Sequence, residues 1–469
     1  MSRGSIEVDY LVIGAGAAGM AFTDALIEVS DASVLMVDRR HGPGGHWNDA
    51  YPFVRLHQPS AFYGVNSRNL GDDRIDASGP NAGLYERATA AEICHYFQAV
   101  MHDRLLASGQ VEFLPMTTCA VNGSDRVHAT AQLTGVEQEI VVRRKVVDAR
   151  YLEGTIPATH TPAFTVDDGV QCLPVSELTH ASHPAGGYVV MGAGKTGMDA
   201  CTWLLDNGVD PAEIAWVKPR ETWALDRAYW QPRDQVGRFM IGWAASIEAA
   251  ATATSIPDLF GRLEECGHLC RVDTSVEPTM YRAGTLSELE IGQLRSIEQV
   301  VRSGRVRRIQ ADRIVLDGGV VATRTDRLHV DCTAEGLGRP PSRPIFEPHR
   351  VTIQQVRETS PTFNAALIGY LEASRDDVDE QNALAPPNAY PDAATDWIRI
   401  RQLGLVAQTT WDHTPDVAEW LERSRLNISA GVIAHAGEPG VGPAIGAYLE
   451  HRDRAVENLT AFRAQLEGG

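Results

Sequence analysis

The chain has 469 residues, which suits two or three domains, and it contains 43% hydrophobic and 22% charged residues, an ordinary balance for a globular protein. Its net charge of −19 repels phosphate backbones and anionic lipid, so we expect neither a nucleic acid nor a membrane as a partner. The seven cysteines are scattered, and no apolar run is long enough to span a membrane. We therefore predict a cytoplasmic protein without disulfides or a metal site; its oligomeric state is left open.

The first predicted elements form a strand–helix–strand unit. An apolar strand at 10–13 leads into Gly14-Ala-Gly16-Ala17-Ala-Gly19, a helix follows from 17 to about 29, and a second strand at 33–37 ends at Asp38. In this order the first glycine permits a tight turn, the second admits a pyrophosphate, and the third lets the helix pack on the strand. Asp38 is placed to accept ribose hydroxyls. The unit predicts a dinucleotide site, and its position alone does not separate FAD from NAD.

The residues that follow are more specific: Asp38-Arg39-Arg-His-Gly-Pro-Gly44-Gly45-His-Trp47-Asn-Asp-Ala-Tyr51-Pro-Phe-Val-Arg55. This stretch resembles the flavin-containing monooxygenases and Baeyer–Villiger monooxygenases, which carry an acid, a short basic linker, a Gly-Gly-x-Trp turn and, in the second family, Tyr-Pro-x-x-Arg. The resemblance implies FAD as the cofactor.

The same resemblance assigns roles to individual residues. Arg39 joins Asp38 among the cofactor-binding residues, Gly44 and Gly45 contact the ribityl and pyrophosphate groups, and Trp47 walls the isoalloxazine pocket. Asn66 and Arg55 are the candidate catalytic residues, with Asn66 as a hydrogen-bond partner of the flavin or its oxygen adduct. The alternatives are that Trp47 is an ordinary core aromatic and that Asn66 only shapes a turn.

A second unit of the same kind follows a set of short strands expected over 111–149. A strand at 187–191 leads into Gly192-Ala-Gly194-Lys195-Thr196-Gly197, a helix runs to about 207, and a strand follows at 214–217. This strand ends in Lys218-Pro-Arg220, where two cations favour a 2′-phosphate and an acid would repel it. We therefore predict NADPH rather than NADH; the alternative is a basic loop unrelated to a nucleotide.

Together the units predict an α/β fold, in which an FAD-binding Rossmann-type domain carries an inserted NADP-binding Rossmann-type domain and a mainly helical C-terminal segment follows. The FAD-binding domain is predicted at 1–170 and 325–373 and the inserted domain at 171–324. Residues 374–469 are predicted to form a lid and helices that complete the first domain. We expect mostly helices over 235–300, three strands over 306–332 and a final helix over about 444–466. The start of that helix either faces the flavin or ends an ordinary loop.

The resemblance implies an FAD-dependent, NADPH-consuming oxidoreductase, and specifically a monooxygenase that uses O2 to insert one oxygen atom into a small organic substrate through a flavin C4a-(hydro)peroxide. The chain departs from that family just before the second glycine turn, where Phe-x-Gly-x-x-x-His is replaced by Pro174, Ser176 and His180. Two alternatives therefore stay open. One is a flavin-dependent dehydrogenase or reductase without oxygen transfer, and the other is a non-catalytic nucleotide-binding redox sensor or partner protein.

Overall fold

The computed structural model describes residues 5–120 and 126–468. Its first sheet has the strand order β19-β20-β6-β1-β2-β3, and the four pairings from β20 to β3 are parallel. Two further strands, β4 and β5, extend it as an antiparallel hairpin beside β6. The strand bounds are β1 Ile6–Ile13, β2 Val34–Val37, β3 Val111–Leu114, β4 Thr117–Ala120, β5 Arg126–Ala131, β6 Glu137–Asp148, β19 Phe346–Glu347 and β20 Arg350–Thr352.

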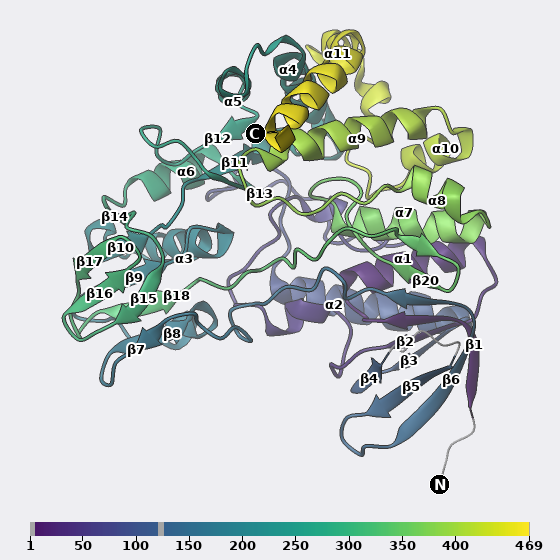
Figure 1. Cartoon of the computed structure of the whole chain (residues 1–469), viewed down its shortest axis with the longest axis horizontal. Coiled ribbons are helices and arrows are strands. Elements are labelled where there is room, and N and C mark those ends of the chain that lie inside the picture. Colours follow the sequence, from purple (N-terminus) through teal and green to yellow (C-terminus); the bar gives the residue numbers. More distant parts are fainter. Residues whose placement is uncertain (1–4, 121–125, 469) are drawn as a thin grey trace.

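Three helices cover one face of this sheet (Figure 1). They are α1 (Ala17–Val29), α2 (Ala90–Val100) and α7 (Pro361–Ser374), and they share one hydrophobic core with β1 and β2. A Cβ atom built on Gly369 would lie 2.4 Å from the carbonyl oxygen of Phe22, so the glycine lets α7 approach α1 this closely. Helix α7, which follows β20 in sequence, therefore packs in the core of the first sheet; the wider assignment of residues 374–469 to this domain stays a prediction.

The second sheet contains only parallel strands, in the order β14-β10-β9-β18-β8. Its elements are β8 Gln171–Pro174, β9 Tyr188–Met191, α3 Lys195–Asp206, β10 Ile214–Val217, α6 Glu288–Arg295, β14 Gln299–Val301 and β18 Leu328–Asp331. All of these strands lie in sequence between β6 and β20 of the first sheet. The predicted fold class is confirmed: two Rossmann-type parallel sheets, with the second inserted within the first.

A small outer sheet covers the second one, in the order β17-β16-β15-β7. Its strands are β7 Thr165–Val166, β15 Val306–Ile309, β16 Arg313–Leu316 and β17 Gly319–Ala322. Together with β18, the region predicted to hold three strands holds four. A tight turn at Asp317 and Gly318 joins β16 to β17 as an antiparallel pair.

A helical layer lies on the opposite side of the molecule from the outer strands β4 and β5 (Figure 1). It consists of α4 Val236–Thr252, α5 Ile256–Glu265, α8 Val378–Leu384, α9 Asp396–Asp412, α10 Pro415–Arg423 and α11 Val441–Gly468. Beneath it lies a three-stranded sheet of β11 Thr222–Asp226, β12 Leu269–Cys270 and β13 Met280–Leu286. The expectation of mostly helix over 235–300 is therefore only partly correct, because β12, β13 and β14 fall within it. No helix in the described ranges is both long and apolar enough to cross a membrane.

Candidate functional site

The first glycine turn follows β1 directly. Gly14 has φ +109°, in the left-handed region that favours glycine, and a Cβ atom on Gly19 would lie 2.0 Å from the Gly14 carbonyl oxygen. The third glycine therefore lets α1, which begins at Ala17, pack closely on the turn, as predicted. A Cβ atom on Gly16 would lie 3.4 Å from Cα of Gly45, so the Gly44–Gly45 turn lies against the second glycine. The Gly44 amide also donates to the Ala15 carbonyl, at 2.9 Å.

Asp38 lies buried at the end of β2, next to this turn. One carboxylate oxygen accepts from the Ala15 amide at 2.7 Å, and the other accepts from the Arg40 amide at 2.8 Å. Each carboxylate oxygen can accept a further hydrogen bond, so both keep capacity for ribose hydroxyls. Arg39 points outward and pairs with Glu153 at 2.5 Å. The FAD-binding roles of Asp38 and Arg39 stay predictions.

Aromatic side chains follow the Gly44–Gly45 turn. The Trp47 indole donates to the Tyr63 hydroxyl at 2.7 Å, and the two rings meet edge to face at 6.0 Å. Tyr63 in turn packs on Phe97 at 6.2 Å, and burial raises the pKa of the Tyr63 phenol. Trp47 is half-buried, so it fits either a pocket wall or the edge of the core.

The two predicted catalytic residues lie on different parts of the same segment. Arg55 donates to the Arg87 carbonyl at 3.0 Å, whereas the Asn66 side chain accepts from the Ser424 hydroxyl at 2.9 Å. The structure thus links Arg55 to the interior network described below and Asn66 to the C-terminal region. Their catalytic roles stay predictions.

The second glycine turn repeats the first with one difference. Gly192 has φ +141°, and a Cβ atom on Gly197 would lie 2.3 Å from the Gly192 carbonyl oxygen. A Cβ atom on Gly194 would meet no described atom within 4 Å. The second glycine therefore faces open space, which is the room a pyrophosphate needs. No side chain of the described residues caps the start of α3, so its first amides point toward that space.

Lys195 and Thr196 begin α3. The Lys195 ammonium forms an ion pair with Asp199 one helical turn later, and Asp199 also accepts from the Tyr51 hydroxyl at 2.7 Å. Tyr51 follows the Gly44–Gly45 turn closely in sequence. This hydrogen bond therefore brings the segment after the first turn against the helix that starts at the second.

The two cations after β10 have different environments. The Lys218 ammonium is buried, pairs with Glu221 at 2.5 Å and lies 4.3 Å from the centre of the Trp216 ring. Burial lowers the pKa of Lys218, and the Glu221 carboxylate partly offsets this. A 2′-phosphate would have to displace Glu221 to reach it, so Arg220 is the better placed of the pair. Both roles stay predictions.

Arg220 belongs to a surface cluster around one carboxylate. It binds both oxygens of Asp392, at 3.0 and 2.9 Å. Arg282 and Arg339 reach the same carboxylate at 2.7 and 3.3 Å, and Arg339 also pairs with Glu335 at 2.8 Å. Three guanidinium groups thus share two carboxylates, which leaves one positive charge in excess. The sequence did not indicate this cluster, because only Arg220 lies near the glycine motif.

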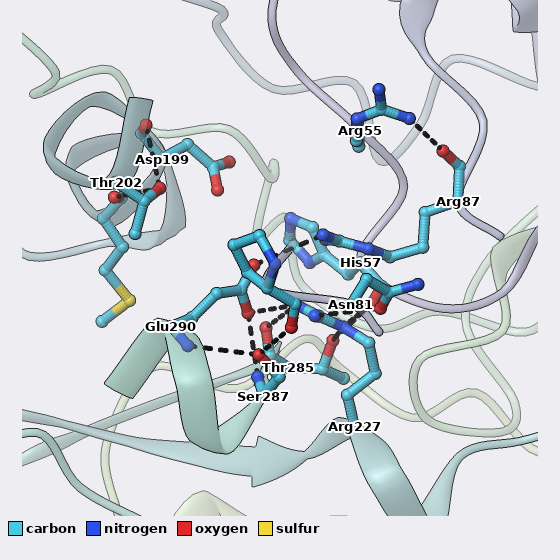
Figure 2. A network of polar contacts seen from close by, with 12 residues as sticks. Arg55, His57, Asn81, Arg87, Asp199, Thr202, Arg227, Thr285, Ser287 and Glu290 are labelled. Carbon is cyan, nitrogen blue, oxygen red and sulfur yellow. Dashed lines mark hydrogen bonds and ion pairs between the residues drawn. The ribbon is translucent and has the colours of Figure 1, made fainter. Parts of the chain in front are cut away.

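A second, buried network connects the segment before α2 with α6 (Figure 2), and its Glu290 carboxylate lies close to Lys195. Glu290 of α6 accepts from Arg227 at 2.6 Å and from Arg87 at 3.4 Å, and all three side chains are at least nine-tenths buried. Burial alone would raise the pKa of Glu290, but the cations of Lys195, Arg227 and Arg87 lower it to about 2. Lys195, Arg87 and Arg227 face Glu290 and Asp199, so this network also carries one excess positive charge.

His57 is a functional candidate that the sequence did not single out. Its carbonyl accepts from Arg227 at 3.1 Å and from the Thr285 hydroxyl, so the backbone is held firmly (Figure 2). Burial and the nearby Lys195 ammonium lower the pKa of the His57 ring to about 4, although the residue retains exposed surface. Both findings fit a side chain on the wall of a recess. At neutral pH the imidazole there is uncharged.

Comparisons with known proteins identify relatives and a shared fold. The sequence profile of the NAD(P)-binding Rossmann-like domain matches residues 12–65, which include the first glycine turn and Asp38. The uncharacterized protein Rv2000 of Mycobacterium tuberculosis is 46% identical over 430 residues, which cover 92% of this chain and 79% of that protein.

Two solved structures are similar at much lower identity. Cyclohexanone monooxygenase from Rhodococcus sp. Phi1 bound to NADP+ is 15% identical, with a TM-score of 0.46 over 79% of this chain and 85% of that one. The flavin-containing monooxygenase from Stenotrophomonas maltophilia is 15% identical, with a TM-score of 0.46 over 81% of this chain and 99% of that one.

Proposed function

We propose that this chain, which belongs to the family that includes protein Rv2000 of Mycobacterium tuberculosis, is an FAD- and NADPH-dependent monooxygenase acting on a small organic substrate. The observation that carries the proposal is the hydrogen bond from Tyr51 to Asp199. It fixes the segment after the first glycine turn against the helix that starts at the second. A flavin and a nicotinamide bound at these turns would extend toward a common region, as hydride transfer requires.

The residues at the first turn fit FAD. The turn at Gly14–Gly19 and the start of α1 offer backbone amides to the pyrophosphate, and Asp38 keeps acceptor capacity for the ribose. Gly44 and Gly45 have no side chains and lie against this turn. The rings of Trp47 and Tyr63 supply an aromatic surface next to it. When bound, the flavin supplies the electron transfer and oxygen chemistry that the side chains cannot perform.

The residues at the second turn fit NADPH. Gly194 leaves room for the pyrophosphate, and Lys195 and Thr196 stand at the start of α3. Arg220 stands at the end of β10 with Arg282 and Arg339 beside it, where a 2′-phosphate would add a third anion to a cluster that has one uncompensated cation. NADH lacks that phosphate, so this cluster would favour NADPH.

The neutral ring of His57 lies close to Lys195, and its lowered pKa together with its exposed surface would fit a position on the wall of a recess. A neutral imidazole can donate or accept one hydrogen bond without adding a charge. It can therefore orient a polar group of the nicotinamide or the substrate, while the adjacent Lys195 holds the positive charge. Removing water from such a recess would protect a reactive reduced cofactor from side reactions.

The test begins with purified protein reconstituted with FAD. We expect NADPH to bleach the bound flavin under anaerobic conditions faster than NADH does. Isotopically labelled O2 should then appear in an organic product when a substrate is present. Stoichiometric hydrogen peroxide with no labelled product would identify a flavin-dependent reductase instead, and flavin that NADPH does not reduce would favour a redox sensor. Protein that stays colourless after exposure to FAD would refute the proposal.

The link between the two turns can be tested separately with Tyr51→Phe. This variant keeps the ring and removes the hydrogen bond to Asp199, so we expect unchanged FAD content and slower flavin reduction by NADPH. Tyr370→Phe is the matched control, because it removes a hydrogen bond of 2.9 Å from a tyrosine to Asp416 on α10. Equal reduction rates in both variants would contradict the role given to the Tyr51–Asp199 bond.

A further inference from the structure

A cavity of about 170 Å³ lies apart from both glycine turns, among α4, α9, α11 and the loop that joins β20 to α7. These three helices lie side by side at one end of the molecule (Figure 1). Its walls are mostly aromatic and apolar, and two arginines and a glutamate enter it. The lining residues include Trp230, Phe239, Met240, Trp243, Arg357, Glu358, Gly404 and Arg401.

Arg357 supplies a cation without a direct ion-pair partner among the described residues; the nearest carboxylate that acts on it, Asp412, lies at the rim. Its guanidinium donates to the side-chain oxygens of Asn427 at 2.6 Å and Gln408 at 2.9 Å, and it stacks over Phe363 at 4.2 Å. Within the described residues it forms no ion pair, and burial lowers its pKa to about 10. Burying a charge without a counter-ion is unfavourable, so this arrangement is poor for stability and suits an anionic ligand.

Arg401 lies on the same cavity and is 3% exposed. It stacks on Trp243 at 4.1 Å, and its terminal nitrogen lies 3.1 Å from His268 and 3.6 Å from Glu358. Its Nε atom is buried and has no hydrogen-bond partner among the described residues. An unpaired buried donor on a cavity wall is a second, independent indication of a missing acceptor.

The charges around the cavity sum to one positive unit. Arg357 and Arg401 face a single interior carboxylate, Glu358, which the Tyr281 hydroxyl also contacts. Asp412 is exposed at the rim, where the Arg452 guanidinium lies 3.5 Å away and offsets its charge. The interior therefore has the charge to hold one carboxylate.

The size of the cavity limits the rest of the ligand. An apolar cavity of about 150 Å³ holds one benzene molecule, so the space here suits a single ring with a short substituent. We propose that the cavity binds a small monocarboxylic acid carrying one ring, with its carboxylate on Arg357 and Arg401 and its ring against Trp230, Phe239 and Trp243. We infer further that such an acid is the substrate; this second step rests on the proposed function.

The position of the cavity agrees with a substrate site. The loop that carries Arg357, Glu358 and Ser360 leaves β20 at the carboxyl edge of the first sheet and leads into α7, which packs on α1. The Gly14–Gly19 turn leaves β1 at the same edge. In open α/β sheets, ligands bind at this edge.

The binding step can be tested without NADPH, by isothermal titration of the flavin-loaded protein with benzoate and with benzamide. The two probes have the same ring and shape, and only benzoate carries a charge. We expect benzoate to bind at least ten times more tightly than benzamide. Arg357→Met should weaken benzoate about 10- to 100-fold and leave benzamide nearly unchanged, because the lost contact is a charged hydrogen bond.

A second variant keeps the test valid if the arginine variant fails to fold. Gly404 lines the cavity on α9, and a Cβ atom there would meet no described atom within 4 Å, so the side chain of Gly404→Leu would start without a clash and occupy space that the ligand needs. We expect it to abolish benzoate binding. Gly261→Leu on α5, where a Cβ atom also meets no described atom, is the matched control and should bind normally.

The outcomes separate the two levels of the inference. Equal affinity for benzoate and benzamide, or benzoate binding that survives Gly404→Leu in folded protein, would overturn the site. Binding of benzoate with the expected losses, but without labelled oxygen or altered flavin reduction when ring acids are supplied, would support the site and overturn its assignment as the substrate site. Protein that binds benzoate yet no flavin would refute the proposed function alone.

Discussion

Replacing Glu290 with glutamine removes the only charge that faces two buried arginines from α6. Glu290 accepts hydrogen bonds from Arg227 and Arg87, which lie 63 and 203 positions away in sequence. A glutamine of the same size keeps one acceptor and loses the negative charge. Two buried guanidinium groups would then lose their ion-pair partner, and Asp199 would be left as the one carboxylate facing the three cations of the network, so the broken buried ion pair should be costly.

The magnitude follows from the pKa of the carboxyl group. The surrounding cations lower it from 4.5 to about 2, and at about 1.36 kcal/mol per unit this corresponds to about 3 kcal/mol of stability. Because the folded-state pKa is lowered, this contribution is fully present above pH 4.5 and is lost as the pH falls toward 2. At pH 3 the wild-type protein should already have lost roughly 2 kcal/mol of it.

The assay is urea unfolding of wild-type protein and Glu290→Gln at pH 7, 5, 4 and 3. We expect a difference in unfolding free energy of about 3 to 5 kcal/mol at pH 7 and 5, which shrinks at pH 4 and 3. Glu288→Gln on the same helix is the control, since Glu288 is exposed, and it should change stability by less than about 0.5 kcal/mol. A Glu290→Gln difference that is small at pH 7, or that stays constant down to pH 3, would refute the reasoning.

Three further predictions concern the glycine turns and the arginine cluster. Gly194→Ala adds a methyl group in open space, so we expect stability within about 1 kcal/mol of wild type and at least tenfold weaker NADPH binding by fluorescence titration, with Gly261→Ala as the control. Gly19→Ala would place a methyl carbon 2.0 Å from the Gly14 carbonyl oxygen. We expect the free energy of unfolding, measured by thermal unfolding, to fall by about 1–3 kcal/mol and bound FAD to be lost. Full retention of flavin would contradict the assignment. Asp392→Asn removes a carboxylate that offsets the charges of Arg220, Arg282 and Arg339. NADPH should then bind several-fold more tightly and with a steeper salt dependence, while the affinity for NADH changes little. An equal change in affinity for both nucleotides would show that the cluster is not a 2′-phosphate site.

The local elements of the fold could be predicted from sequence because each carries its own signal. The helix expected from 17 to about 29 forms α1 (Ala17–Val29), and the strand expected at 214–217 forms β10 (Ile214–Val217). The region 235–300 was harder, because short strands such as β12 and β13 have apolar spacing that also fits a helix. The set of strands expected over 111–149 was predicted to be short, yet it includes one strand of 12 residues, β6 (Glu137–Asp148).

The candidate site likewise contains some residues that could be predicted from sequence and others that could not. The glycines of each turn act through the backbone and lie within a few residues of one another, so the sequence motif itself predicts how they pack. Lys218 and Arg220 read alike in sequence, yet the structure buries one against Glu221 and leaves the other at the surface with Asp392. Partners as distant as Arg87 and Glu290 leave no local pattern at all. The start of α11, for which the alternatives were a position facing the flavin and an ordinary loop before the helix, packs against α4, where a Cβ atom on Gly237 would lie 2.7 Å from Val441; both alternatives stay predictions.

The separate sites share one electrostatic property, a local excess of positive charge in a negatively charged protein. The chain carries a net charge of −19, so its surface as a whole repels anions such as NADPH, FAD and carboxylic acids. Three clusters, two in the interior and one at the surface, reverse that sign locally by one unit each. The interior ones are Lys195, Arg87 and Arg227 against Glu290 and Asp199, and Arg357 and Arg401 against Glu358; the one at the surface is Arg220, Arg282 and Arg339 against Asp392 and Glu335. Because the surrounding charge is negative, an anion gains attraction only after it enters a recess that also fits its shape. Single, localised excess charges therefore select ligands by fit, whereas a broadly basic surface would collect anions of every kind.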